Sequence, residues 1–468
     1  MNSHLRFRRA ERPVEAALVG AGAFGRSLLG QGRRMDLLNV RVAIDVTAER
    51  AAEAFRAVGW PQAEIATCRT AAEADAAWQR GEAVAAGDLT VVLGLPVDIV
   101  VEASGHPEAG AIHTHAAIEA GKHVALVTKE TDSVVGPYLA ALAAERGLVV
   151  TPVDGDQPAL LIGLVTWAET LGLPIIAAGK SSEYDFVYDR AEARLTSEAK
   201  ATPAPGFDAV WSLGDRETVA LIAERARLAA ALPQLAVPDL CEMAVVANAT
   251  GLKPDVASFH APIAHIEEVA SLFVERGQGG LLSGRRRLDV FNGLREPGGL
   301  SFAGGVFIVV ACEDEETWKV LAGKGHTMSR DGKAAMLWLP RHLLGLEAPI
   351  SILDAVVNGV SVAGAPKPVV DLIGRTTRPL AKGTRLDAVG HHHTIDGLAP
   401  ALIDAAPLGT DRPAPYYLIA GRTLLRDLDA GVSVTLGDVD IDEDAPMVAL
   451  RRRQDARFFA EAAGGSGS

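Results

Sequence analysis

The sequence has little of several features that mark particular protein classes. Its 468 residues include three cysteines, Cys68, Cys241 and Cys312, which are too few and too far apart for a disulfide framework. No apolar run is long enough to cross a bilayer, and a net charge of −14 opposes a nucleic-acid-binding surface. We therefore expect no membrane or nucleic-acid partner, and the cysteine content favours a reducing, cytoplasmic setting.

Motifs of other enzyme classes are absent as well. The chain contains no CxxC pair, Walker phosphate loop, HExxH helix or Ser-His-Asp order, so hydrolase and nucleotide triphosphatase functions have no support. Arg6, Arg8 and Arg9 are not followed by an apolar core, so a secretion signal is not expected. The last five residues, GGSGS at 464–468, are typical of a flexible linker or tag remnant.

A glycine-rich turn, GAGAFG, is the most informative motif. It lies between the apolar run VEAALV and the helix-forming stretch RSLLGQG. Gly20 permits a tight turn, Gly22 lets the backbone approach a pyrophosphate, and Gly25 lets the helix pack on the strand. The amides at the start of the helix, including those of Ala23 and Phe24, would then face the phosphates. This pattern predicts that the chain binds NAD or NADP.

Two further segments extend the predicted cofactor site. Asp45 ends the second apolar strand, 20 positions after Gly25, where a carboxylate would accept hydrogen bonds from the adenosine ribose. A carboxylate favours NAD, although Arg41 or Arg50 would offset that preference. The other segment follows the strand DIVVEA and places three residues near the nicotinamide end of the cofactor: Ser104, Gly105 and His106.

Strands and helices alternate along residues 1–155, which predicts a Rossmann-type doubly wound parallel sheet. Residues 156–375 change to longer helical stretches, which we interpret as an α+β domain for substrate binding and dimerisation. Residues 376–463 form a third predicted unit, in which 376–390 echo 423–439. This repeat predicts a small β-clip with hairpin turns at Gly383 and Gly431, and two unrelated hairpins are the alternative.

Several stretches resemble known families. VVEASG, AAIEAGKHVALVTKE and GDQPALL resemble the NAD-binding half of homoserine dehydrogenases. The 1-deoxy-D-xylulose 5-phosphate reductoisomerase-like oxidoreductases join a homoserine dehydrogenase-like NAD-binding domain to a SAF module. The chain resembles them in AAGKSSEY, EMAVVANATGL, LPRHLLGLE and the C-terminal segment. The resemblance implies a homo-oligomeric NAD(P)-dependent oxidoreductase acting on a small polyhydroxy keto or hydroxy acid or a sugar phosphate. A homoserine dehydrogenase-like enzyme and a non-catalytic dinucleotide sensor are the alternatives.

The candidate catalytic residues follow strand ends, where ligands bind in open α/β sheets. Lys129 and Glu130 come after HVALVT, and Lys129 is either substrate-binding or a solvated loop residue. Asp132 is predicted to cap the helix that follows. Asp156 ends the next strand as a helix cap that would also bind a hydroxyl or a metal. Lys180 is the leading candidate for proton transfer, because desolvation would lower its pKa towards neutrality.

Other polar residues are assigned to the substrate. Tyr184 would assist Lys180 or simply pack, and Glu242 and Asn248 lie nearly two turns apart on one predicted helix. Arg341 and His342 would clamp an anionic group or lie at the surface. If the chain is a reductoisomerase, the resemblance implies a divalent ion, with Asp156 or Glu242 as its ligands.

The run GHHHTIDG departs from the family pattern, which has glycine and tyrosine near this place. On a strand successive side chains alternate, so His391 and His393 would share a side and His392 would oppose them. We therefore do not expect one metal to bind all three. His392 is assigned to acid-base chemistry, and His391 and His393 to hydrogen bonds with the substrate.

Overall fold

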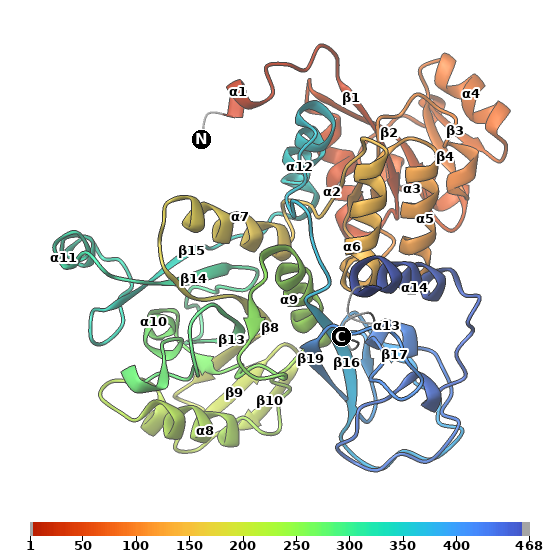
Figure 1. Cartoon of the computed structure of the whole chain (residues 1–468). Helices are drawn as coiled ribbons and strands as arrows, with labels where there is room; N and C mark the ends of the chain where they lie inside the picture. Colours follow the sequence, from red (N-terminus) through yellow and green to blue (C-terminus); the bar gives the residue numbers. More distant parts are fainter. Residues whose placement is uncertain (1–2, 461–468) are drawn as a thin grey trace, which may run out of the picture.

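The computed structural model describes residues 3–460, which form two large sheets and a smaller C-terminal β region (Figure 1). The first sheet is entirely parallel, with strand order β3-β4-β2-β1-β5-β6-β7. Its strands are β1 (Val14–Val19), β2 (Leu38–Ile44), β3 (Ile65–Cys68), β4 (Ala83–Ala86), β5 (Ile99–Glu102), β6 (His123–Leu126) and β7 (Val150–Thr151).

This sheet confirms the predicted Rossmann-type fold. Helices cover both of its faces, so central strands such as β5 are buried throughout. The neighbours of β1 are β2 on one side and β5 on the other, which puts the reversal of strand order at β1. Its helices and 3₁₀ turns are α1 (Ser3–Arg6), α2 (Ala23–Gly32), α3 (Ala48–Ala57), η1 (Gln62–Glu64), α4 (Ala71–Gln79), η2 (Leu89–Val91), α5 (Pro107–Glu119) and α6 (Lys129–Glu145).

The second sheet is mixed and has eight strands. β8 (Ile175–Asp189) is its long central strand, parallel to β13 (Arg287–Arg295) and antiparallel to β14 (Val306–Ala311) and β9 (Arg194–Ser197). The remaining strands are β10 (Lys200–Pro203), β11 (Lys253–Pro254), β12 (Ile263–Ala264) and β15 (Ala334–Leu339). The longer helical stretches expected here are therefore only part of the region, because β-rich segments supply its core.

The helices of this region lie around the second sheet, and two of them matter for the site. α7 (Gln157–Thr170) and α9 (Val237–Thr250) pack against each other and against β8. The others are η3 (Phe207–Val210), α8 (Thr218–Leu228), η4 (Ile266–Glu268), α10 (Val269–Leu272), η5 (Arg276–Gln278), α11 (Glu315–Gly323), η6 (Leu344–Leu346), α12 (Pro349–Leu353) and the π-helical turn η7 (Asp354–Asn358).

Two later segments return to the first sheet. η6 packs on α2, and buried Ala348, Ile352 and Leu353 join the apolar core of the Rossmann sheet. α14 (Pro446–Phe459) lies against α5 and α6, where Gln454 Nε2 donates to Val134 O at 3.0 Å (Figure 1). Segments that follow residues 155 and 375 thus pack on the first sheet, and the predicted domain boundaries stay a prediction.

The C-terminal β region contains the predicted repeat. Leu380 and Leu428 exchange two backbone hydrogen bonds of 2.9 Å, Gly383 N donates to Leu424 O, and Gly431 N donates to Thr376 O. The two copies pair with each other instead of forming two separate hairpins, although both glycines are left-handed as a turn requires. The SAF-type assignment stays a prediction.

The other elements of this region are β16 (Val370–Thr376), β17 (Ala388–Val389), β18 (Thr394–Ile395), β19 (Leu398–Asp404), α13 (Tyr416–Ile419) and η8 (Leu436–Asp438). Within residues 3–460, no helix combines the length and the apolar character that a membrane span needs. The GGSGS tail and the predicted domain end at 463 lie outside the described residues.

Candidate active site

The glycine turn has the geometry that its sequence predicts. Gly20 has φ +92°, and a Cβ there would meet Ala103 O at 2.2 Å. A Cβ at Gly25 would meet Gly20 O at the same distance, whereas Gly22 has no neighbour within 4 Å of such an atom. The first and third glycines therefore permit close packing, and the second leaves open space in front of α2.

A cavity of about 640 Å³ opens at this turn, a size that suits a small-molecule cofactor. Asp45 and Arg50 line one side of it, and Ser104 and His106 line another. The amides of Ala23, Phe24 and Gly25 belong to the first turn of α2, where backbone N–H groups have no partner within the helix. The structure thus brings the predicted cofactor residues to one place at the carboxyl ends of β1, β2 and β5.

Asp45 is already held by several groups. Its Oδ2 accepts from Ala21 N at 3.0 Å, its Oδ1 accepts from Val46 N at 2.8 Å, and Arg50 Nε lies 3.2 Å from Oδ1. Arg41 instead stacks on Trp78, with its guanidinium carbon 3.5 Å from the ring centre. Of the two arginines that could offset the preference for NAD, Arg50 is therefore the one at the cavity.

Gly105 connects this cavity to the next group of charged residues. Its N–H donates to Thr128 Oγ1 at 3.1 Å, and Thr128 is the N-cap of α6, directly before Lys129. Asp132 lies in the first turn of this helix, so it is not the N-cap that the sequence suggested. His106 is an N-cap itself, because its Nδ1 accepts from Ala109 N at 3.3 Å at the start of α5.

Lys129, Lys180, Asp239 and Glu242 form a buried group that we call the lysine-carboxylate cluster. One oxygen of Glu242 accepts from Lys129 Nζ and the other accepts from Lys180 Nζ. Lys180 Nζ also lies 2.9 Å from Asp239 Oδ1. The other oxygen of Asp239, Oδ2, accepts from Ser182 Oγ at 2.6 Å. These residues come from α6, β8 and α9, so only the tertiary fold assembles them.

Ion pairing decides the charges in this cluster. Burial raises the pKa of Glu242, but the two ammonium groups outweigh it and lower the pKa to about 2. Burial lowers the pKa of Lys180, but Asp239 and Glu242 outweigh it and the pKa ends above its ordinary value. The expectation of a lowered Lys180 pKa is therefore wrong, because its buried ammonium has two carboxylate partners. Lys180 is 0% exposed, whereas the Lys129 side chain is 22% exposed and is the one that a substrate can reach.

Asp156 and Glu130 lie beside the cluster, and burial raises the pKa of both carboxyl groups. Asp156 Oδ1 accepts from Gln157 N at 3.0 Å, which confirms its position as the N-cap of α7. Burial raises the pKa of Asp156, and Lys129 opposes that shift. Burial also raises the pKa of Glu130, to about 7, with Lys129 again opposing it. A pKa in this range is the one that suits a general acid or base near neutrality.

A divalent ion does not fit Glu242, one of the two ligands that the resemblance suggested. Glu183, Asp239 and Glu242 offer oxygens close enough together to hold a cation. Lys180 Nζ lies within 4 Å of an oxygen of each of them and supplies the positive charge itself. Both oxygens of Glu242 already face ammonium groups, so we derive no metal-dependent step at this cluster.

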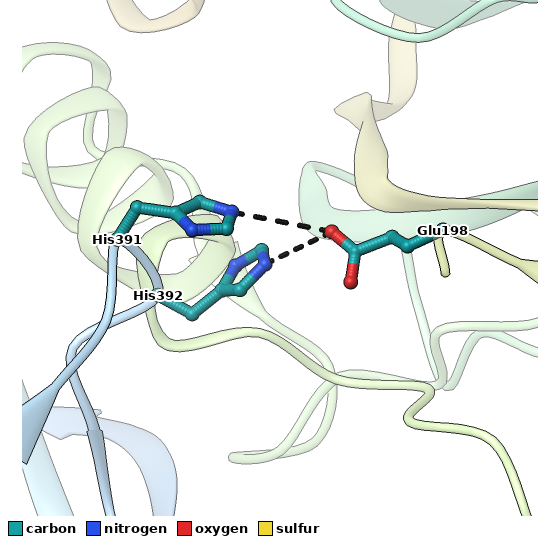
Figure 2. Close-up of side chains that lie close together, drawn as sticks. All are labelled: Glu198, His391 and His392. Carbon is teal, nitrogen blue, oxygen red and sulfur yellow. Dashed lines mark hydrogen bonds and ion pairs between the residues drawn. The ribbon is translucent and has the colours of Figure 1, made fainter. Parts of the chain in front are cut away.

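The three histidines lie in a turn between β17 and β18 instead of on a strand. His391 and His392 face the same residue, Glu198 (Figure 2). His393 points elsewhere, with Nδ1 3.7 Å from Glu130 Oε1. The predicted pairing of His391 with His393 is wrong, because left-handed backbone at Gly390 and His393 breaks strand alternation. The ring of His392 also lies 5.3 Å from that of Tyr184, which is buried at the end of AAGKSSEY.

Three predicted substrate residues have other contacts. Asn248 Oδ1 accepts from Val369 N at 2.8 Å and Val370 N at 3.2 Å, so it fixes the start of β16 and lies away from the cluster. Arg341 pairs with Glu347 at 3.0 Å on its own segment. His342 is half-buried and lies close enough to Asp156 to affect the pKa of that carboxyl.

Sequence reasoning missed Asp239 and Glu198. Asp239 stands three residues before Glu242, a spacing that places both on one helix face and could have revealed the pair. Glu198 stands in the turn between β9 and β10, and nothing in its sequence neighbourhood indicates a histidine partner in a distant segment.

The comparisons with known proteins agree with an oxidoreductase. The family model "Oxidoreductase DRL, catalytic domain" matches residues 238–348. Curated relatives called 1-deoxy-D-xylulose 5-phosphate reductoisomerase include one from Anaeromyxobacter dehalogenans, 31% identical over 207 residues that cover 44% of this chain and 46% of the relative. Another, from Heliobacterium modesticaldum, is 43% identical over 104 residues that cover 19% and 23%. The chain therefore spans less than half the length of these relatives.

Solved structures show weaker likeness. GenD2 from gentamicin A biosynthesis, in complex with NAD, aligns over 76% of this chain and 91% of its own at 14% identity and a TM-score of 0.35. The WlbA dehydrogenase from Bordetella pertussis, in complex with NADH and UDP-GlcNAcA, aligns over 37% and 48% at 16% identity and a TM-score of 0.28. Such scores are too low to carry an argument, and the fold assignment rests on the strand order.

Proposed function

We propose that the chain is an NAD(P)-dependent oxidoreductase that interconverts a hydroxyl and a carbonyl group on a small polyhydroxy substrate. The observation that carries the proposal is the continuity of two sites. Ser104 lines the glycine-turn cavity, and the next residue, Gly105, donates to Thr128 at the helix start that carries Lys129. A reacting carbon held there would face both a nicotinamide ring and a protonated lysine.

The residues divide the chemistry among themselves. A bound nicotinamide would supply or accept the hydride. The partly exposed ammonium of Lys129 would donate a hydrogen bond to the substrate oxygen and stabilise its developing negative charge. Glu130, with a pKa of about 7, would give or take the hydroxyl proton near neutrality. Lys180 contacts no solvent, so its role would be to hold Glu242 and Asp239 in position.

The substrate class is part of the proposal. The names of the curated relatives favour a sugar phosphate and a rearrangement before reduction. Both carboxylate oxygens of Glu242 already accept hydrogen bonds from lysine ammonium groups. This favours direct hydride transfer, as in a hydroxy-acid or polyol dehydrogenase, because the rearrangement would call for a divalent ion at Glu242. We favour the direct reaction, carried out by a cytoplasmic homo-oligomer without nucleic-acid or membrane partners.

The test begins with cofactor binding. The melting temperature should rise when NAD(H) or NADP(H) is added, since ligands that bind the folded state stabilise it. A panel of hydroxy acids, polyols and sugar phosphates, followed by nicotinamide absorbance, should then reveal turnover. No thermal shift with either cofactor contradicts the proposal. Binding without turnover over the whole panel favours the alternative, a dinucleotide sensor.

A further inference from the structure

A second cluster of titratable groups lies apart from the lysine-carboxylate cluster. It consists of Glu198, His391 and His392, and we call it the His-Glu cluster. Glu198 lies in the turn that joins β9 to β10, and the histidines lie in the turn that joins β17 to β18. Figure 2 shows both imidazole rings directed at one oxygen of Glu198. The cluster therefore joins two regions of the chain that are far apart in sequence.

We propose that the His-Glu cluster is a binding site for a divalent transition-metal ion of the Zn²⁺ type. Two imidazoles and one carboxylate are ligands that Zn²⁺ accepts in open sites. Tetrahedral ligands at zinc bond lengths lie about 3.4 Å apart. Here Glu198 Oε1 is 3.1 Å from His392 Nε2 and 4.0 Å from His391 Nε2, and all three ligand atoms lie within 4.8 Å of one another. Small side-chain movements would complete the geometry.

The surroundings favour a cation over other occupants. The carboxylate of Glu198 repels an anion, and among the described residues its ion pairs are with the two histidines of the cluster. The two histidine rings are adjacent, with centroids 3.8 Å apart, so both can offer a nitrogen to one ion. His391 is 77% exposed, which leaves a coordination position open to water.

The buried side of the cluster leaves one nitrogen unpaired. Nδ1 of His392 is buried and has no hydrogen-bond partner among the described residues. Glu198 and His393 both have left-handed backbone, with φ +50° for each, and such strain persists where surrounding contacts impose it.

A bound ion would fix the histidine turn over the proposed active site. His392 contacts Tyr184, two residues after Ser182, and His393 in the same turn faces Glu130. The metal would therefore cross-link residues 194–203 to residues 388–395 without touching the reacting atoms. Its role is to order the turn, and it is independent of the proposed hydride transfer.

The experiment uses the full chain without a histidine tag, stripped of metal with a chelator and dialysed. Titration with Co²⁺ should produce the visible absorption of a tetrahedral complex at one ion per chain, and Zn²⁺ should displace it. His392→Ala and Glu198→Gln should each weaken Zn²⁺ binding at least about tenfold. His326→Ala is the matched control, because this histidine is exposed and lies outside the cluster.

A second readout separates a cross-link from a loose surface site. On Zn²⁺ addition, amide exchange in residues 194–203 and 388–395 should slow in the parent protein and in His326→Ala, but not in His392→Ala. Circular dichroism should confirm that each variant is folded. Absence of stoichiometric binding, or binding that survives both His392→Ala and Glu198→Gln, overturns the proposal. Slower exchange that is the same in His392→Ala overturns it as well.

Discussion

The lysine-carboxylate cluster and the His-Glu cluster solve the same electrostatic problem differently. Each gathers titratable side chains from distant segments within bonding reach of one another. In the first, Lys180 places an ammonium among the carboxylates, and the group is buried except for the Lys129 side chain, which is 22% exposed. In the second, no side chain of the described residues supplies that charge, and the group faces water. A buried cluster must carry its own counter-ion, whereas an exposed one can take it from solution.

Removal of the internal cation should have the largest effect. Lys180→Ala would leave Asp239 and Glu242 buried beside fewer positive charges, and should lower the free energy of unfolding by about 3–5 kcal/mol. Mg²⁺ or Mn²⁺ should restore part of the loss, because the space vacated would suit an oxygen-bound ion. Chemical denaturation with and without metal would measure both effects. Lys200→Ala, at an exposed position, is the control, and an unchanged stability of Lys180→Ala would refute the internal-cation interpretation.

The partly exposed member of the same cluster should matter more for rate than for stability. Lys129→Gln should lower kcat about 100-fold, because it removes the donor that faces the substrate oxygen. The cofactor Kd should stay within about twofold, since the glycine-turn cavity is untouched. Steady-state kinetics and cofactor titration would check this, with Arg341→Ala as a control outside the cluster. Full turnover by Lys129→Gln would exclude the proposed role.

Asp45 extends the comparison to a carboxylate whose cation is exposed. Arg50 pairs with it at 3.2 Å, but its side chain is 65% exposed and free to turn towards a 2′-phosphate. Asp45→Ala should shift the ratio of NADP to NAD affinity about tenfold towards NADP, because it removes repulsion and releases Arg50. Arg50→Ala should shift the ratio the other way. Binding titrations with both nucleotides would measure the two ratios, and an unchanged ratio in both variants would contradict this assignment.

Asp132 is a carboxylate whose environment raises its pKa through burial alone, to about 7. Since the pKa in the folded state exceeds the ordinary value of 3.8, ionisation reduces stability as the pH rises from about 4 to about 7, and the reduction stays constant above that. Asp132→Asn should therefore match the parent near pH 4 and be more stable at pH 8, by on the order of 1 kcal/mol because the side chain is only half-buried. Melting curves across this range would show a pH-independent difference if the interpretation is wrong.

The features that depend on neighbouring residues could be predicted. The glycine turn, the alternation that gives the parallel sheet and the N-cap at Asp156 are all local patterns, and each lies where the sequence placed it. The prediction that Asn248 binds the substrate was wrong, because helical spacing shows which residues share a helix face but not which segment covers that face. Here the start of β16 covers it and takes the amide oxygen.

The sequence by itself determined a Rossmann-type sheet and the opening in front of its first helix, because both follow from periodicity and from where glycine is required. Tertiary structure decided the charges. Lys180 is held as an ammonium only because α9 brings Asp239 and Glu242 to it. His391 and His392 share an ion-pair partner only because a distant hairpin supplies Glu198. A pKa or a metal site depends on atoms within a few ångströms, and chain order does not specify which segments meet at that distance.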